Sequence, residues 1–339
     1  MPSSPDFEPQ DWLALIENAA RRLADVAVRT PLLDIPLLND RLGGRVLVKA
    51  ECLQRTGSFK LRGATNFLAQ LDPAVRARGV VTHSSGNHGQ AVACAAAAFD
   101  VPATVVIPEG APEVKLRRTE GWGAEILRCR NTAADRERVA GEAADARGGT
   151  LVPPFDHPWI VAGQGTVGLE IVEDLPDVAN VLVCVGGGGL SSGSVLALAE
   201  RAPRARVIGV EPELAADAHE SLSKGERTSW PAERTTRTIA DGVRTQALGE
   251  VPWRILKEGL AGIVTVSEDE IRAAAVWWAR HGRLVVEPTG ALTLAAWRRL
   301  TAGTAAGVTL ADGPTVLVIS GGNVDDDVLT GLLSDPALR

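Results

Sequence analysis

The sequence lacks tyrosine altogether across its 339 residues, which excludes any mechanism that uses a tyrosine hydroxyl as acid or base. Cysteine is scarce. Cys52, Cys94, Cys129 and Cys184 stand far apart in apolar surroundings, with none of the pair spacings typical of metal sites. Scattered thiols of this kind favour burial in a reducing compartment, so we expect a cytoplasmic protein.

Long apolar runs and clusters of basic residues are also missing. No apolar run approaches the roughly 18 residues that a membrane span needs, and the first residues are polar and acidic, unlike a secretory signal. The formal net charge is −7, with 42 acidic and 35 basic residues and no basic run. Nucleic acid and membrane are therefore excluded as main partners.

Glycine, in contrast, is abundant at 35 residues, as many tight turns between strands and helices require. Short apolar runs alternate with helical patterns along most of the chain. Strands are expected at 46–50, 79–82, 104–107, 125–127, 150–152, 181–185, 207–210 and 315–319. Helices are expected at 11–24, from 60, from after Gly89 to 99, and at 112–120, 132–146, from 161, 190–200, 268–281 and 290–300. This alternation predicts an α/β fold of helix-covered, mostly parallel sheets.

The length favours two lobes over one core. Gly148-Gly149 and Pro153-Pro154 bracket one strand, and we place the return to the first lobe there. The predicted domains are a large one at 1–76 and 155–339 and a small inserted one at 77–154. Since the strand 315–319 lies near the end of the sequence, we expect no C-terminal regulatory domain.

The stretch TGSFKLRGATN, residues 56–66, places Lys60 in the first turn of a predicted helix. Gly57 allows a sharp turn after the strand 46–50, and Ser58 is a candidate helix cap. The positive end of a helix disfavours an ammonium, which lowers the lysine pKa and favours the neutral amine that attacks carbonyls. Taken alone, a lysine here is more often simply solvated.

Two polar glycine turns follow predicted strands. SSGNHG (84–89) and VGGGGL (185–190) each let backbone N–H groups converge on an anion. A rival interpretation takes Gly186, Gly188 and Glu211 as a dinucleotide-binding fingerprint, although Ser191 stands at its third glycine. A nicotinamide cofactor needs no lysine, whereas two anion cradles and Lys60 together point to pyridoxal phosphate.

The motifs SFKLRGA, SSGNHGQA, AGQGT, GGGGL, EPELAAD, ADGV, EPTGA and SGGNVD occur in this order between Thr30 and Asp325. Together they resemble the pyridoxal-phosphate-dependent serine/threonine dehydratase and serine racemase family, of fold type II. The resemblance implies two lobes with the cofactor in the cleft between them, a small amino-acid substrate and a homodimer.

The resemblance also implies roles for individual residues. Lys60 would carry the Schiff base, with Phe59 beside the pyridine ring, Asn87 on the ring hydroxyl and Ser320 facing the ring nitrogen. The phosphate would lie on Gly186, Gly187, Gly188, Gly189 and Leu190. The substrate carboxylate would lie on Ser84, Ser85, Asn87 and His88, with Arg136 nearby. Glu211, Asp217 and the carbonyl of Ala215 would hold Mg²⁺, or else Ca²⁺ or Mn²⁺.

Two details separate dehydratases from racemases. Ser85 stands where serine racemases carry the residue that reprotonates Cα opposite the lysine, whereas Phe155 and Leu190 resemble dehydratases. The sequence favours β-elimination of L-threonine or L-serine to a 2-keto acid and ammonia. Serine racemase and threo-3-hydroxyaspartate dehydratase stay open. A non-catalytic binding protein is disfavoured because Lys60 and all the surrounding motifs are present.

Overall fold

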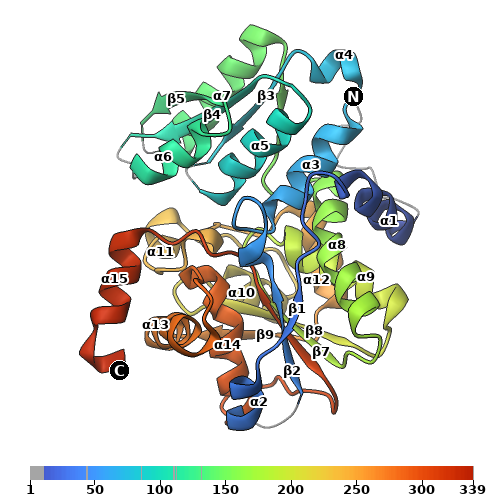
Figure 1. The fold of residues 1–339 in the computed structure, drawn as a ribbon, viewed down its shortest axis with the longest axis vertical. Coiled ribbons are helices and arrows are strands. Elements are labelled where there is room, and N and C mark those ends of the chain that lie inside the picture. Colours follow the sequence, from blue (N-terminus) through green and yellow to red (C-terminus); the bar gives the residue numbers. More distant parts are fainter. Residues whose placement is uncertain are drawn as a thin grey trace.

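The computed structural model describes residues 11–42, 45–84, 86–109, 111, 113–130 and 132–338. Its strands form two separate sheets, one of six strands and one of four, which Figure 1 shows in the lower and upper halves of the molecule. All four strands of the smaller sheet come from one continuous part of the chain. The predicted α/β fold of mostly parallel sheets is confirmed.

The larger sheet has the strand order β1-β2-β10-β7-β8-β9. Its strands are β1 (Leu32–Asp34), β2 (Val46–Ala50), β7 (Asn180–Cys184), β8 (Arg206–Pro212), β9 (Ile263–Val266) and β10 (Thr315–Ile319). Only β1 at the edge is antiparallel to its neighbour. β2, β7 and β10 are buried at every position, as a parallel sheet covered on both faces requires.

The smaller sheet has the order β5-β4-β3-β6 and is parallel throughout. Its strands are β3 (Val80–His83), β4 (Ala103–Pro108), β5 (Glu125–Cys129) and β6 (Thr150–Leu151). The division into a large domain at 1–76 and 155–339 and a small one at 77–154 stays a prediction.

Helices surround both sheets (Figure 1). In the first half of the chain they are α1 (Trp12–Leu23), α2 (Pro36–Leu42), α3 (Lys60–Gln70), α4 (Pro73–Arg76), α5 (Asn87–Ala98), α6 (Glu113–Glu120), α7 (Ala133–Arg147) and α8 (Pro158–Asp174). They continue with α9 (Gly189–Arg201), α10 (Asp217–Lys224), α11 (Ala232–Thr235), α12 (Glu250–Gly259), α13 (Glu268–Trp277), α14 (Pro288–Thr301) and α15 (Asp326–Ser334). Short 3₁₀ turns occupy Glu51–Leu53, Asp241–Val243 and Pro336–Leu338, and a π turn occupies Trp278–Gly282.

The sequence missed several elements. It predicted none of β1, β9 and α12, and it started α8 at Val161, although Pro158 begins that helix behind the cap His157. The cap on α3 was also wrong. Ser58 makes no cap bond there, because it pairs with Gly321 in an isolated antiparallel bridge while the Phe59 N–H donates to the carbonyl of Ser320.

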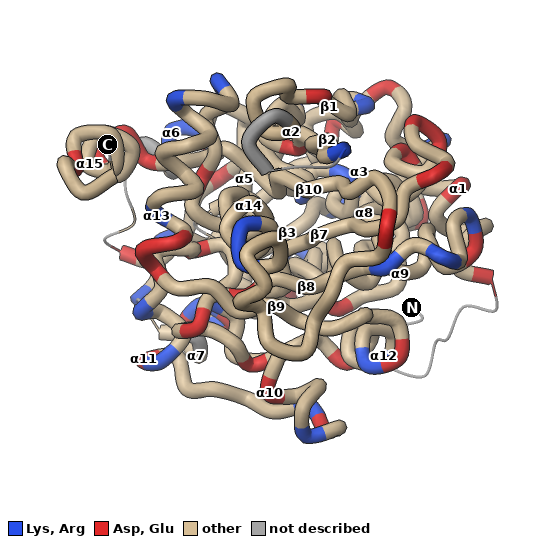
Figure 2. Tube along the Cα trace, turned by 90° about the horizontal axis from the view of Figure 1, so that it is seen from below, with Lys and Arg blue, Asp and Glu red and all other residues tan. Residues whose placement is uncertain are grey.

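The charge distribution, the hydropathy of the helices and the state of the cysteines bear on the sequence analysis. Figure 2 shows residues of both charge signs along single helices such as α10 and α12, without segregation by sign. In the described part of the chain, no helix is long and apolar enough to cross a bilayer. All four cysteines are free thiols, three of them buried.

Candidate functional site

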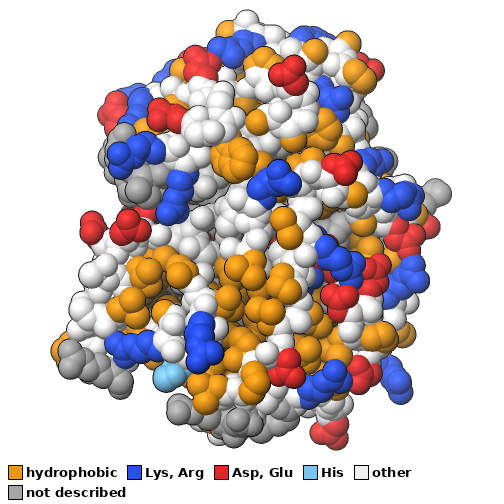
Figure 3. All heavy atoms as spheres, viewed as in Figure 1, with side chains coloured by type: hydrophobic (Ala, Val, Ile, Leu, Met, Phe, Trp, Pro, Cys, Tyr) orange, Lys and Arg blue, Asp and Glu red, His pale blue; other side chains and the backbone are white. Residues whose placement is uncertain are grey.

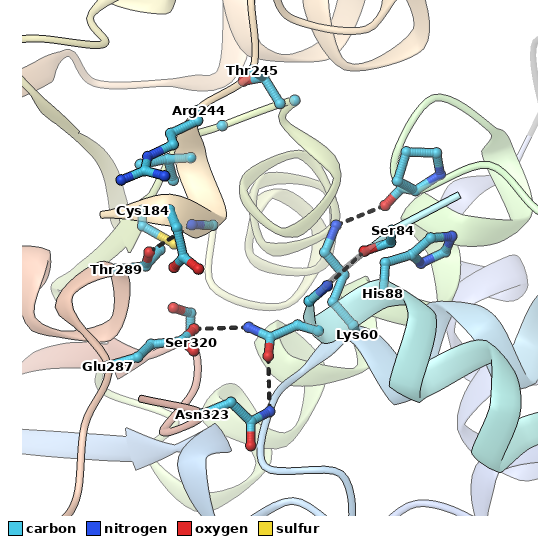
Figure 4. Close-up of a pocket in the computed structure, with 18 of the residues that line it drawn as sticks. Lys60, Ser84, His88, Cys184, Arg244, Thr245, Glu287, Thr289, Ser320 and Asn323 are labelled. Atoms are coloured by element: carbon cyan, nitrogen blue, oxygen red, sulfur yellow. Dashed lines mark hydrogen bonds between the residues drawn. The ribbon is translucent and has the colours of Figure 1, made fainter. Parts of the chain in front are cut away.

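A cavity of about 870 Å³ lies between the two sheets (Figure 4). The residues that line it belong to the start of α3, to the β3–α5 and β7–α9 turns, and to the segment after β10. These segments follow the carboxyl ends of parallel strands, where ligands bind in folds of this type. Nearly all predicted site residues line this one cavity: Phe59, Lys60, Ser84, Asn87, His88, Arg136, Gly186, Gly187, Gly188, Gly189, Leu190 and Ser320.

Lys60 is the first residue of α3 and extends into the cavity (Figure 4). Its ammonium donates a hydrogen bond to the carbonyl of Pro154 at 2.8 Å. Burial lowers the pKa of Lys60 to about 8, so about a tenth of it is neutral amine at pH 7, far more than for a solvated lysine. The direction of this shift is the predicted one, but its main cause is loss of water and not the helix end.

Two glycines of the turn that lines the same cavity, Gly187 and Gly188, leave no room for a side chain. Gly188 has φ +93°, a left-handed conformation that favours glycine, and it caps α9. A Cβ on Gly187 would lie 2.3 Å from the ring of Phe155. The first turn of α9 directs backbone N–H groups without helical partners toward this turn, which makes it an anion cradle.

His88 is buried beside Lys60, and its Nε2–H donates to the carbonyl of Val152 at 3.1 Å. Burial, followed by the charge of Lys60, lowers the pKa of His88 to about 3, so the ring is neutral. Nearby, the Ser84 hydroxyl accepts the Gly86 N–H at 3.2 Å. Ser85, the residue predicted to reprotonate Cα, lies outside the described residues.

A chain of side-chain hydrogen bonds fixes Asn87, as Figure 4 shows. The Asn87 amide donates to Glu287 at 2.8 Å, and its carbonyl oxygen accepts from the Asn323 amide at 2.8 Å. The same Asn323 amide donates to the carbonyl of Thr56. The sequence contained Glu287 and Asn323 within EPTGA and SGGNVD but assigned neither a role, since nothing local shows that both reach Asn87.

Cys184 and Ser320 are uncharged groups on the cavity wall. Burial raises the pKa of the Cys184 thiol to about 11, which keeps it protonated. Ser320 is 1% exposed, and its hydroxyl lies near the Cys184 thiol, whose pKa it lowers, but it makes no hydrogen bond of normal geometry within the described residues. A buried hydroxyl of this kind lacks a partner that a ligand atom can supply.

These features fit pyridoxal phosphate. The glycine turn provides a phosphate cradle, Lys60 an amine for the aldehyde, and Ser320 an unsatisfied hydroxyl for the ring nitrogen.

Glu211 and Asp217 form a separate site, away from the residues that line the cavity. Both side chains are buried, and Glu211 accepts the backbone N–H groups of Ala218 and His219. Burial raises the pKa of both carboxyls, to about 7 for Asp217. Since Glu211 is held there, it does not support the dinucleotide fingerprint. Over the described ranges, no three His, Cys, Asp or Glu side chains come together as a metal cluster.

Comparisons with known proteins agree with this geometry. Residues 23–321 match the family model described as pyridoxal-phosphate dependent enzyme. The chain is 40% identical to a serine racemase of Schizosaccharomyces pombe over 94% of this chain and 96% of that protein. It is also 40% identical to an L-threo-3-hydroxyaspartate ammonia-lyase of Saccharomyces cerevisiae, over 91% and 92%.

Among solved structures, a threonine deaminase of T.th. superposes with a TM-score of 0.86 at 42% identity, covering 92% of this chain and 98% of that one. The resemblance inferred from the motifs is confirmed. The chain therefore belongs to the pyridoxal-phosphate-dependent enzymes and, among them, to the fold type II family of serine/threonine dehydratases and serine racemases.

Proposed function

We propose that this protein is an ammonia-lyase that eliminates the β-hydroxyl of L-threonine or L-serine and yields a 2-keto acid and ammonia. The observation that carries the proposal is Lys60, a buried amine with a pKa of about 8 that faces a glycine anion cradle across one cavity. Relatives with this chemistry in their names support the reaction class.

Bound pyridoxal phosphate supplies an electron sink for negative charge at the substrate Cα. Lys60 would hold its aldehyde, Gly186 to Leu190 its phosphate and Ser320 its ring nitrogen. The remaining chemistry belongs to the chain. Lys60 would be released when the substrate amine takes its place on the aldehyde, and as a neutral amine it would remove the proton from Cα, which its lowered pKa favours.

The substrate carboxylate is placed by the turn 84–88 in this proposal. Ser84, Asn87 and His88 line one side of the cavity, and the Asn87 amide is already held by Glu287. A neutral His88 can donate only the proton it gives to Val152, so it orients this turn and does not act as an acid. Arg136 supplies the positive charge. Ser85 keeps its predicted role in reprotonation as a proposal.

One observation favours a second candidate substrate, L-threo-3-hydroxyaspartate. Two arginines, Arg136 and Arg244, line the cavity. The Nε and Nη2 groups of Arg244 donate to the carbonyl of Thr238, the first at 2.9 Å, which leaves the Nη1 donors for a carboxylate. A second carboxylate on the substrate would match the second guanidinium. Relatives named for this activity are known at the same identity as the racemase.

The buried pair Glu211–Asp217 supports a divalent cation, Mg²⁺ or else Ca²⁺ or Mn²⁺. Asp217 Oδ2 is buried without a hydrogen-bond partner among the described residues, and hard carboxylate oxygens suit these ions. With two carboxylates, the site needs the Ala215 carbonyl and water to complete the coordination. The cation would hold α10 against β8.

A homodimer is our proposal for the assembly. Figure 3 shows apolar side chains gathered over the part of this face where Figure 1 places α13 and α14. Exposed Val285 and Leu53 indicate unburied apolar surface on the larger-sheet half of the protein.

The deciding experiment incubates the protein, supplied with pyridoxal phosphate and Mg²⁺, separately with L-serine, L-threonine and L-threo-3-hydroxyaspartate. Keto acid and D-amino acid are measured together. Keto acid without D-isomer is expected, whereas D-serine formed faster than pyruvate would replace the lyase by a racemase. Lys60→Ala should lose turnover together with the absorbance of the bound cofactor. Arg244→Lys should reduce hydroxyaspartate turnover more than threonine turnover if that substrate is used.

A further inference from the structure

A second cavity, of about 830 Å³, lies on the other side of the segment that leads from β6 to α8. Its walls come from the end of α3, from α7, from β6 and from residues 153–159. The volume falls in the range of small-molecule sites, and most of the wall is apolar. Nothing in the proposed reaction uses this space.

Three aromatic rings form one wall of this second cavity. Phe67 lies 5.0 Å from the His157 ring and 5.6 Å from the Trp159 ring, between centroids, and His157 lies 5.1 Å from Trp159. All three contacts are edge-to-face, so the rings hold one another at fixed angles. Leu71, Ala140 and other aliphatic side chains complete the apolar part of the wall.

The charged groups of the second cavity are all acidic. Asp72, Glu137 and Asp145, all three exposed, line it, and no lysine or arginine does so among the residues that the structure describes. Asp72 already accepts N–H groups as the cap of α4, so the carboxylates that remain for a ligand are Glu137 and Asp145. Glu137, Ala140 and Ala144 follow the helical spacing that puts them on one face of α7. The two histidines add no positive charge at neutral pH, because burial lowers the pKa of His83 and lowers that of His157 to about 4.

The two cavities share one residue, Pro154. Its carbonyl accepts the Lys60 hydrogen bond, while the residues that follow it hold other parts of the fold. Phe155 packs on Gly187 of the anion cradle, Asp156 accepts the N–H groups of Glu250 and Val251, and His157 accepts the N–H of Trp159. A ligand that displaces this segment therefore also displaces Phe155, which packs on the anion cradle.

We propose that the second cavity binds a small aromatic cation, an aryl ring that carries a tertiary or quaternary ammonium, and that its occupancy is coupled to the cofactor site through Pro154 and Phe155. The aromatic wall supplies ring faces and edges for the aryl group and ring faces for the cation. The acidic side chains of the cavity match the positive charge and disfavour anions such as nucleotides. The binding itself does not depend on the reaction proposed above.

Calorimetry on the holoenzyme with benzyltrimethylammonium tests the site, because a quaternary amine cannot react with the cofactor. Binding is expected, and benzenesulfonate, an anion of similar size, should not bind. Glu137→Gln with Asp145→Asn should weaken binding about fivefold, and Trp159→Leu at least as much. Glu200→Gln with Glu258→Gln removes two exposed carboxylates elsewhere and should change nothing.

The position of the ligand is tested with Lys60→Ala, which should bind benzyltrimethylammonium as tightly as the parent protein. Loss of binding in Lys60→Ala would place the ligand in the first cavity and overturn the proposal, as would equal binding by the Glu137→Gln, Asp145→Asn variant or no binding at all. Coupling is measured as the rate at which the holoenzyme releases pyridoxal phosphate. A change of at least twofold on adding the ligand, absent from the double variant, is expected; an unchanged rate would contradict the coupling.

Discussion

Two groups of buried carboxylates in this protein have opposite electrostatic surroundings. The first, the charge cluster, comprises Glu51, Glu170, Arg62 and Lys49 from four different elements. Arg62 bonds Glu51 at 2.8 Å and Glu170 at 2.6 Å, and Lys49 bonds Glu170 at 2.6 Å. The second, the carboxylate pair, comprises Glu211 and Asp217, in which Glu211 accepts backbone N–H groups.

The pKa shifts of the two groups differ in sign. Burial alone raises the pKa of Glu51, but the charge and hydrogen bonds of Arg62 outweigh it and the net shift is downward. Burial raises the pKa of Glu211, and the charge of Asp217 raises it further. Equal burial therefore leaves one carboxylate ionised and lets the other hold a proton, so the adjacent cation decides the charge state.

The difference also indicates what each group does. The charge cluster is neutral as a whole and joins β2, α3 and α8 close to Lys60 in the first turn of α3, so it positions that lysine. The carboxylate pair contains no cation of its own, and it is complete only with a proton or a metal ion. The charge cluster is therefore complete without a ligand, whereas a metal ion at the carboxylate pair is part of our proposal.

Breaking the charge cluster should have the largest effect. Arg62→Met leaves Glu51 and Glu170 buried without their main partner, which we expect to lower the free energy of unfolding by about 3–5 kcal/mol. Urea unfolding followed by circular dichroism measures this loss. Arg138→Met, which removes two ion pairs of a half-exposed arginine, is the matched control. A loss below about 1 kcal/mol in Arg62→Met would show that the cluster does not stabilise the fold in this way.

Adding a cation should change the carboxylate pair alone. If Mg²⁺ binds there, a hundredfold excess over its Kd stabilises the folded protein by about 2.7 kcal/mol, visible as a rise in Tm. Glu211→Gln with Asp217→Asn should abolish the rise while unfolding cooperatively without metal. Equal Mg²⁺ responses of the parent and this variant would place any cation elsewhere.

A rise in pH should change the contributions of the two groups to the free energy of unfolding in opposite directions. Asp217 has a folded pKa raised to about 7, so in metal-free protein its stabilising proton is held at low pH and lost as the pH rises through about 7. Between pH 6 and 8 this costs about 1 kcal/mol of unfolding free energy. The pKa of Glu51 is lowered in the folded protein, so its ionised carboxylate stabilises the fold at pH values above the pKa of the unfolded chain. This stabilisation is lost only as the pH falls into the acid range.

Urea titrations at pH 6, 7 and 8 in the presence of a chelator measure the slope of the unfolding free energy against pH. Asp217→Asn should flatten it, and added Mg²⁺ without chelator should flatten it as well, since the bound cation replaces the proton. A slope that survives both changes would assign the titration to another group.

The contrast between the two groups also explains what the sequence could and could not predict. Lys60, the glycine turn and Glu211–Asp217 each lie within one short motif, and the predictions there concern residues close together in the chain. The charge cluster joins positions 49, 51, 62 and 170, and Asn87 is fixed by Glu287 and Asn323. Such contacts depend on the packing of distant elements. The wrong cap on α3 has the same cause, because Gly321 holds Ser58 from the far end of the chain.

The smallest effect is expected from an arginine whose ion-pair distances match the shorter distances in the charge cluster. Arg29 bonds Glu173 and Asp174 at 2.6 Å each, but its side chain is 50% exposed. Water already solvates these charges, so Arg29→Ala should cost no more than about 1 kcal/mol, and less still at high salt, where screening is strong. Urea unfolding at low and high salt measures both values. A cost that approaches that of Arg62→Met, and that salt leaves unchanged, would mean that contact distance and not burial sets the strength of these pairs.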